Sequence, residues 1–262
     1  SRSGALMGES VMFLNQAMAT LRDIWREIGI PERLQLERTE AVRAHVKSLL
    51  DMMISEEESL KEYLLNSITA CQRELDTLHR ELQLDPFEAE EQGTILQTER
   101  DLRARVQVLL KQKADRKQEL KTLQEQDQEL CNILCAARFP IDSDAVPSLK
   151  DLDLYRRHVA ALSAEKERRR EEFVSTKQQI LLLMEELEHS PENSFEQDVV
   201  SSDEEDFCLS QHNIAALQSL RQQLEAQRSL NADLCVELRS RIAELWERLQ
   251  VPAEERELSA VH

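Results

Sequence analysis

The sequence predicts an all-α protein in which an N-terminal helical hairpin that dimerises is followed by an elongated antiparallel helical-bundle rod. Composition is the first reason: 32% of the 262 residues are charged, 4% are aromatic and 4 residues are Gly, a profile typical of long helices. The second reason is the segment 32–84, which contains neither Gly nor Pro. Its apolar residues recur at steps of three and four, which places them on one helix face. One helix of roughly 75 Å is expected here, and it needs partner helices to cover that face.

A shorter helix is predicted over residues 6–28, because Gly29 and Pro31 end its apolar stripe. Only a few residues separate it from the long helix, so the two should fold back as a hairpin. A hairpin leaves an apolar face open, and two copies packed face to face would form a four-helix bundle. We therefore expect residues 1–66 to form a homodimerisation module whose second helix continues into the rod. The expected dimer interface consists of Leu14, Leu21, Trp25, Ile28, Val42, Val46, Leu49 and Met53.

The rod is expected over residues 67–252, with further helices at about 94–136, 149–187 and 209–249. The helix at 149–187 carries the most regular heptad pattern, with Ser148 as its expected N-cap. An acidic linker, Phe87 to Gly93, and an acidic loop at 190–206 separate these helices, and residues 253–262 resemble the start of a further helix that the chain cuts off. Helices of matching length joined by turns favour antiparallel packing.

Charged residues interrupt the expected seam of the rod at Lys113, Arg116, Lys166 and Arg169. Antiparallel pairing about a turn near Ile141 would place Lys113 and Arg116 level with Glu171 and Arg168, and Arg169 level with Asp115. Two interpretations stay open. The long side chains could extend to water, or they could form a polar layer that fixes helix register at some cost in stability.

The two Trp residues of the chain occupy equivalent positions in a short internal sequence repeat. The segment LRDIWREIGIP, from Leu21 to Pro31, recurs as IAELWERLQVP, from Ile242 to Pro252. Each Trp could close the end of a bundle where a helix turns back. Alternatively, each could anchor a partner protein, since exposed Trp residues are common in interfaces.

Charge and motif content exclude several classes of function. A net charge of −18 disfavours nucleic acid and anionic membranes as ligands. The sequence contains no phosphate-binding loop, no dinucleotide fingerprint and no catalytic motif, so we expect neither an enzyme nor a cofactor. Cys131 and Cys135 share a helix face, but His or Cys at zinc-ligand spacing is missing, so no metal site is expected. The five Cys residues are expected to be reduced thiols of an intracellular protein.

The acidic loop offers candidate modification sites. Ser201 and Ser202 are followed by Glu204 and Glu205, which is the pattern of an acid-directed kinase site. Such short patterns are frequent by chance, so an unmodified solvated loop is the alternative.

Four long runs carry a family resemblance. They are RTEAVRAHVKSLLDMMISEEESLKEYLLNSI from Arg38, LQEQDQELCNILC from Leu123, REEFVSTKQQI from Arg170 and LWERLQVP from Leu245. These runs resemble the N-terminal half of the non-motor microtubule-associated proteins that crosslink antiparallel microtubules in the spindle midzone during cytokinesis.

This resemblance implies a homodimer built from N-terminal hairpins and a rod that spaces two microtubules. It also implies a microtubule-binding domain beyond this chain, a class-four kinesin as partner, and a location at the spindle midzone and midbody, with the nucleus in interphase. The alternative is a coiled-coil scaffold whose rod mainly docks cell-cycle partners.

Overall fold

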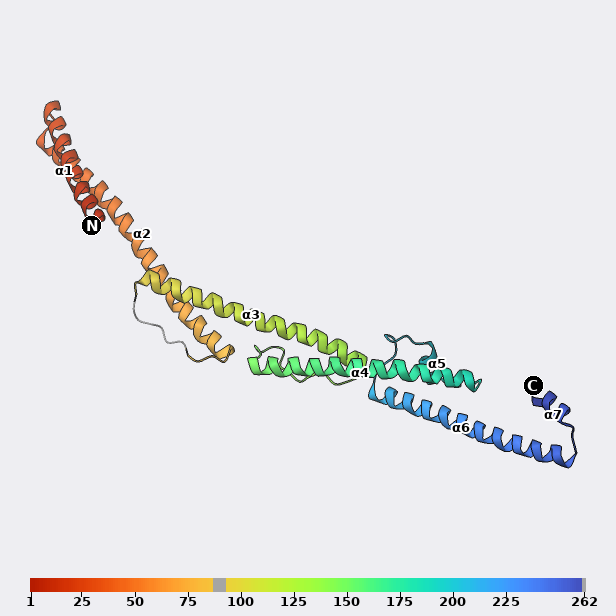
Figure 1. Cartoon of the computed structure of the whole chain (residues 1–262). Helices are drawn as coiled ribbons and strands as arrows, with labels where there is room; N and C mark the ends of the chain where they lie inside the picture. The colour runs from red at the N-terminus through yellow and green to blue at the C-terminus, as the bar shows by residue number, and fades with distance from the viewer. Residues whose placement is uncertain (87–92, 261–262) are drawn as a thin grey trace. The chain divides into compact units, whose positions relative to one another are not determined.

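The computed structural model describes residues 1–86 and 93–260, and all regular structure in that part of the chain is helical (Figure 1). The predicted all-α class is therefore confirmed. Observed and predicted ends of the long helices differ by at most four residues, at the start of the first helix. Phe87 to Gln92 of the predicted acidic linker and residues 261–262 lie outside the described residues. The helices are α1 (Arg2–Ile28), α2 (Glu32–Glu81), α3 (Ile95–Leu134), α4 (Leu149–Glu186), α5 (Ser194–Ser201), α6 (Gln211–Arg248) and α7 (Ala253–Ala260).

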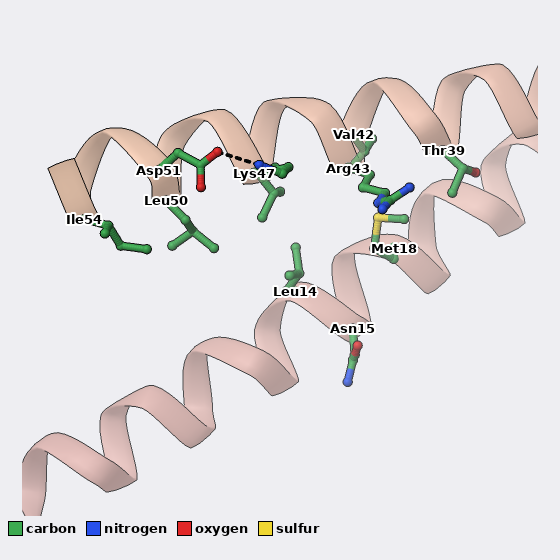
Figure 2. Close-up of a pocket in the computed structure, with 11 residues that line it drawn as sticks. Leu14, Asn15, Met18, Thr39, Val42, Arg43, Lys47, Leu50, Asp51 and Ile54 are labelled. Carbon is green, nitrogen blue, oxygen red and sulfur yellow. Dashed lines mark hydrogen bonds and ion pairs between the residues drawn. The ribbon is translucent and has the colours of Figure 1, made fainter.

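The chain divides into two compact units. The first holds Ser1–Thr77 and Phe87–Val108, and the second holds Leu78–Pro86 and Leu109–His262. In the first unit, α1 folds back beside the N-terminal part of α2, as the predicted hairpin requires (Figures 1 and 2). Near the other end of α2, Ser67 donates a hydrogen bond of 3.0 Å to Glu99 of α3. Glu99 is almost fully buried there and is neutralised by Arg103.

The long helices α3, α4 and α6 of the second unit run parallel to one another, so the predicted antiparallel packing is wrong. Glu119 of α3 pairs with Arg156 of α4, and further along both helices the Leu134 carbonyl accepts from Arg169. Residue numbers rise together along both helices. The same holds for α4 and α6, where Glu172 contacts Gln218 and Glu186 contacts Arg228.

The helices are parallel because the segment that connects them is not a tight turn. It runs back along the first helix before the next helix begins, and we call it the return path. Residues 135–148 run back along α3: Phe139 donates its N–H to Asp127, Ser143 contacts Gln124, and the Pro147 carbonyl accepts from Arg116. The distance from residue 134 back to 116 is about 27 Å along a helix. Fourteen extended residues span up to about 46 Å, which is enough for the return. Helix α4 therefore starts beside the middle of α3, and α6 starts beside the middle of α4.

Among the described residues of the second unit, two apolar clusters hold α3 to α4 and α4 to α5 and α6. One joins α3 and α4 through Leu120, Leu123, Leu130, Leu152, Tyr155 and Val159. The larger one gathers the end of α3, the second half of α4, α5 and the first half of α6 around Phe173, Ile180, Val199, Phe207 and Leu217. The heptad predicted for α4 is confirmed at seven positions: Leu152, Tyr155, Val159, Phe173, Thr176, Ile180 and Leu183 are buried. Ser148 is its N-cap, as predicted, and accepts from the Asp151 N–H at 3.0 Å.

The predicted acidic loop is wrong in its middle part, because α5 forms within residues 190–206. Asn193 caps this helix by accepting from the Glu196 N–H at 2.8 Å. Val199 is fully buried against the larger cluster, and Glu196 is buried beside His189. The acidic residues at the end of the segment give it the overall composition of a solvent-exposed loop. Composition alone therefore does not reveal residues such as Val199, which face the core.

Five helices end in the same way, with a residue in the left-handed conformation. These residues are Gly29, Gln83, Cys135, Glu188 and Gln250, with φ between 50° and 85°. After each, the next N–H donates to a carbonyl five residues earlier, for example Ile30 to Trp25 and Val251 to Trp246, both at 2.9 Å. This is the Schellman helix end. The two similar sequence segments, 21–31 and 242–252, are therefore two copies of the same helix end. In both copies the Trp carbonyl accepts the hydrogen bond.

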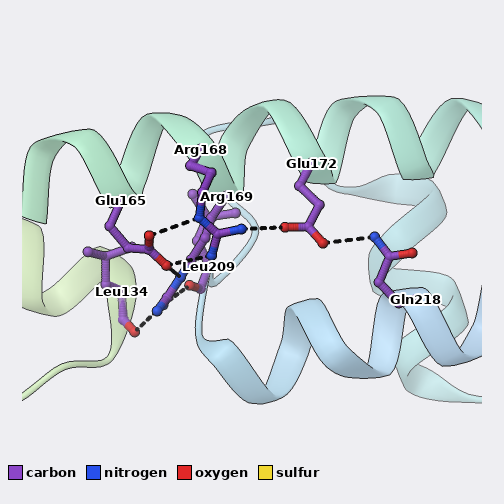
Figure 3. A network of polar contacts seen from close by, with 7 residues as sticks. All are labelled: Leu134, Glu165, Arg168, Arg169, Glu172, Leu209 and Gln218. Carbon is purple, nitrogen blue, oxygen red and sulfur yellow. Dashed lines mark hydrogen bonds and ion pairs between the residues drawn. The ribbon is translucent and has the colours of Figure 1, made fainter.

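Two arginines, the buried Arg116 and the half-buried Arg169, connect these helix ends to the following helix. Arg116 of α3 donates to the Leu82 carbonyl at the end of α2 and to Pro147, just before the N-cap of α4. Arg169 of α4 donates to Leu134 at the end of α3, at 3.5 Å, and to Leu209, at 2.8 Å, just before the N-cap of α6 (Figure 3). The same arrangement, an arginine that binds the end of the previous helix and the start of the next one, thus occurs once on α3 and once on α4.

A network of polar residues surrounds the second arginine. Arg168 and Arg169 both donate to Glu165 and lower the pKa of its carboxyl to about 2. Arg168 also binds Glu172, whose other oxygen accepts from Gln218 of α6 at 2.9 Å (Figure 3). These contacts tie α4 to α6 as well as to the end of α3.

We predict that Arg169→Met lowers the free energy of unfolding by about 2–3 kcal/mol, because the Leu134 and Leu209 carbonyls lose a charged donor. Urea unfolding followed by circular dichroism measures this. Arg157→Met is the control, since Arg157 is exposed and pairs with Asp153 within its own helix. Equal losses in the two variants would contradict the role given to Arg169.

Asp127 gives a pH-dependent prediction. Its carboxylate is fully buried and accepts from the Tyr155 hydroxyl, the Cys131 thiol and the Phe139 N–H. Burial alone would raise its pKa, but these three hydrogen bonds together lower the pKa below its ordinary value of 3.8. The ionised Asp127 carboxylate therefore stabilises the fold at a pH above its ordinary pKa of 3.8. This contribution is lost as the pH falls through the lowered pKa of the folded protein.

Removing one donor should show this dependence. We expect Tyr155→Phe to cost about 1.5–3 kcal/mol at pH 7, and the difference from the parent protein to narrow below about pH 4 as Asp127 is protonated. Thr122→Val, which removes an exposed hydroxyl from α3, should change stability by less than about 0.5 kcal/mol. A loss for Tyr155→Phe that does not depend on pH would rule out Asp127 as its cause.

Candidate functional site

The N-terminal hairpin carries an apolar groove where α1 diverges from α2. Figure 2 shows Leu14 on α1 facing the gap, with Leu50 and Ile54 on the opposite helix. The groove has a volume of about 600 Å³. Lys47 and Asp51 form an ion pair of 2.7 Å within α2 at its edge. Eleven residues line it: Leu14, Asn15, Met18, Thr39, Val42, Arg43, Val46, Lys47, Leu50, Asp51 and Ile54.

The apolar surface extends beyond this groove along both helices. In α1, Trp25 alone is buried although the helix has 27 residues. Apolar side chains that stay exposed include Leu6, Met7, Val11, Met12, Phe13, Leu49, Leu50, Met52, Met53, Ile54, Leu60 and Tyr63. Monomeric soluble proteins rarely expose apolar patches of this extent unless another molecule covers them. We call the groove and these flanking residues the hairpin surface.

The residues predicted for the dimer interface all belong to this hairpin, but they differ in exposure. Ile28, Leu49 and Met53 are exposed by 67%, 54% and 53%, and Leu14 by 37%. Leu21, Val42 and Val46 are half-buried between α1 and α2. Trp25 is only 8% exposed, so within one chain it closes the hairpin.

Sequence reasoning missed part of the hairpin surface. Met18, Leu50 and Ile54 line the groove but were not among the predicted interface residues. Each lies four residues after another groove residue: Met18 follows Leu14, Leu50 follows Val46, and Ile54 follows Leu50. Continuing the helical spacing from the predicted positions would have found them.

The four residues of the predicted polar layer occupy different places. Lys113 pairs with Glu81 at 2.6 Å, and Arg116 binds the end of α2, so neither lies level with the expected residues of α4. Arg169 pairs with Glu165, not with Asp115. Lys166 is half-buried along a groove between α3 and α4. The predicted pairing is wrong because it assumed antiparallel helices. Arg116, which is buried, and Arg169, which is half-buried, nevertheless fix helix positions.

The two candidate phosphorylation sites lie at the end of α5. The Ser201 hydroxyl is exposed and donates to the Gln197 carbonyl at 2.7 Å. Ser202 is half-buried, and its carbonyl accepts from Lys177 of α4 at 2.6 Å. Modification of these serines stays a prediction.

Residues 1–86 and 93–260 carry neither a metal centre nor a membrane span. No group of three or more His, Cys, Asp or Glu side chains there could hold a metal ion. None of the helices in that part of the chain is long and apolar enough to cross a membrane. The hairpin surface is therefore the candidate functional site.

Comparison with known proteins agrees with the runs singled out in the sequence. Residues 15–262 match the model of the family described as "Microtubule associated protein (MAP65/ASE1 family)". The chain is 58% identical over 259 residues to human protein regulator of cytokinesis 1 and 57% identical over 256 residues to the mouse protein of that name. These alignments cover 99% and 98% of this chain but 42% of each relative, so the chain spans less than half of their length. The family match across almost the whole chain, together with this identity, shows that the chain belongs to the MAP65/ASE1 family of microtubule-associated proteins.

Proposed function

We propose that this chain is the homodimerisation and spacer region of a protein that crosslinks antiparallel microtubules in the spindle midzone during cytokinesis. The hairpin surface joins two copies, and the helices of the second unit set the distance between the bound filaments. The observation that carries the proposal is the imbalance in α1, where one residue of 27 is buried and several large apolar side chains are exposed. A second copy would cover them in a four-helix arrangement.

The role is mechanical and not enzymatic. Two-fold symmetry would point the far ends of two chains in opposite senses, so that antiparallel filaments are selected. Microtubule binding is assigned to a domain outside this chain, because the net charge of −18 disfavours binding to an acidic filament surface. A class-four kinesin is the proposed partner, and the proposed location is the spindle midzone and midbody, with the nucleus in interphase.

The oligomeric state tests the proposal directly. Light scattering on a sizing column should give twice the 30.4 kDa chain mass for this chain, and a monomer for a version that starts at Glu32. Two monomers would contradict the homodimer. Unchanged helix content per residue, measured by circular dichroism, would show that α2 survives removal of α1.

Point variants locate the interface within the hairpin. Leu49→Glu with Met53→Glu should weaken the dimer at least about a hundredfold, since each buried side chain contributes about 1.5 kcal/mol or more. Both side chains are half exposed in the single chain, so its own fold does not need them. Leu182→Glu is the matched control, because Leu182 is 66% exposed on α4. Sedimentation equilibrium measures the dissociation constants, and similar values for control and test variants would remove α2 from the interface.

A second candidate function is a scaffold that docks cell-cycle partners. It is favoured by a separate apolar stripe on the second half of α6, where Leu230, Leu234, Leu238, Ile242 and Leu245 are exposed. Deleting the residues before Glu32 from the longer protein separates the two roles. The crosslinker proposal expects loss of filament bundling, whereas the scaffold expects bundling to persist.

A further inference from the structure

Two cysteines from distant parts of the chain meet where α3 ends and α6 begins. The Sγ atoms of Cys135 and Cys208 lie 2.7 Å apart, although 73 positions separate them in the sequence. Cys135 is the left-handed residue directly after α3, and Cys208 lies two residues before Ser210, the N-cap of α6. Both thiols are free.

The surrounding backbone, and not the thiol contact itself, holds the two cysteines together. The Leu209 N–H donates to the Ile133 carbonyl at 3.1 Å, so the residues next to each cysteine are hydrogen-bonded to one another. Arg169 donates to the carbonyls of Leu209 and Leu134 on the same two segments. On the α6 side, Asn213 donates to the Cys208 carbonyl at 3.0 Å. A covalent bond between the sulfurs would therefore join segments that are already fixed.

We propose that Cys135 and Cys208 form an intramolecular disulfide when the protein meets a small-molecule disulfide such as oxidised glutathione, and that this bond clamps the end of α3 to the start of α6. This inference rests on the second unit alone and does not depend on the proposed crosslinking function.

The reaction is a two-step thiol–disulfide exchange. One cysteine thiolate attacks a sulfur of oxidised glutathione, forms a mixed disulfide and releases one glutathione thiolate. The other cysteine, as thiolate, then attacks the protein sulfur of that mixed disulfide and releases the second glutathione. Two cysteine thiols are oxidised, one glutathione disulfide is reduced to two glutathione thiols, and the two cysteine protons end on those thiols.

The other cysteines explain why this pair should react selectively. Cys131 lies one helical turn before Cys135 but is buried and donates to Asp127. Burial and the Asp127 carboxylate raise its pKa to about 11, so it is a poor nucleophile at neutral pH. Cys71 is also buried. Cys235 is exposed on α6 and has no thiol neighbour among the described residues, so it can form a mixed disulfide but no internal bond.

The pH dependence of the rate has a predicted sign. The contact with the Cys208 thiol, together with partial burial, raises the pKa of Cys135. The thiolate fraction at pH 7 is therefore small, and closure should be faster at pH 8.5 than at pH 7.

Peptide mapping after oxidation tests the proposal. The whole chain is incubated at low concentration with reduced and oxidised glutathione at pH 8, blocked with N-ethylmaleimide, digested and analysed by mass spectrometry. The expected product is an internal crosslink to Cys208. Trypsin leaves Cys131 and Cys135 on one peptide, 122–138, so the variants Cys131→Ser and Cys135→Ser decide which thiol has reacted.

Four variants make the outcome unambiguous. Cys135→Ser and Cys208→Ser should lose the crosslink, whereas Cys131→Ser and the matched surface control Cys235→Ser should keep it. A crosslink that survives in Cys135→Ser would overturn the assignment. So would a wild-type protein that collects glutathione on Cys135 or Cys208 without closing the bond, or that forms only bonds between chains on non-reducing gels.

Thermal unfolding supplies a second readout. A native-geometry bond that closes a long loop should raise the melting temperature of the oxidised protein by several degrees, and dithiothreitol should reverse the rise. Cys235→Ser should behave like the parent protein. A lower melting temperature after oxidation would mean that the junction must distort to form the bond, which would also overturn the proposal.

Discussion

A helix that ends inside a bundle must find donors for its last carbonyl groups, and the second unit of this protein depends on how that is done. Arg116 and Arg169 each extend from the middle of one helix to the end of the previous one. Each also binds the carbonyl just before the N-cap of the helix that follows, at Pro147 and Leu209. One guanidinium therefore holds three successive segments, because it has five donors in a fixed plane. This contact sets the stagger of the parallel helices.

The same helix ends explain how the chain turns back without glycine. Gln83, Cys135, Glu188 and Gln250 adopt a left-handed conformation that costs a non-glycine residue about 1 kcal/mol. The cost is offset because each turn satisfies carbonyls that would otherwise lack donors. At α4 the pattern is only partly repeated, since Arg228 contacts the Glu186 side chain and not a helix-end carbonyl. The arginine contact is thus a feature of the ends of α2 and α3, while the Schellman end occurs at five helices, α1, α2, α3, α4 and α6.

Helix positions, heptad faces and the Ser148 cap could be predicted because they depend on residues close in sequence. The relative direction of α3 and α4 could not, since an apolar stripe looks alike whether its partner runs parallel or antiparallel. The choice depends on how far residues 135–148 extend and on buried groups such as Asp127, whose partners lie 12 and 28 positions away. Helix α5 was missed for a similar reason, because Val199 faces a core formed by other helices. The Cys135–Cys208 contact likewise requires the return path.

The two units differ in how their apolar residues are used, and this bears on stability. Helix α4 buries eight residues within the chain, whereas α1 buries only Trp25 despite its higher mean hydrophobic content. The second unit thus has a core of its own, while the proposed dimer would supply most of the apolar contacts of α1. Folding of the hairpin and association of two copies would then be one coupled equilibrium, so hairpin stability would rise with protein concentration. Stability of the second unit would not, because its core lies within one chain.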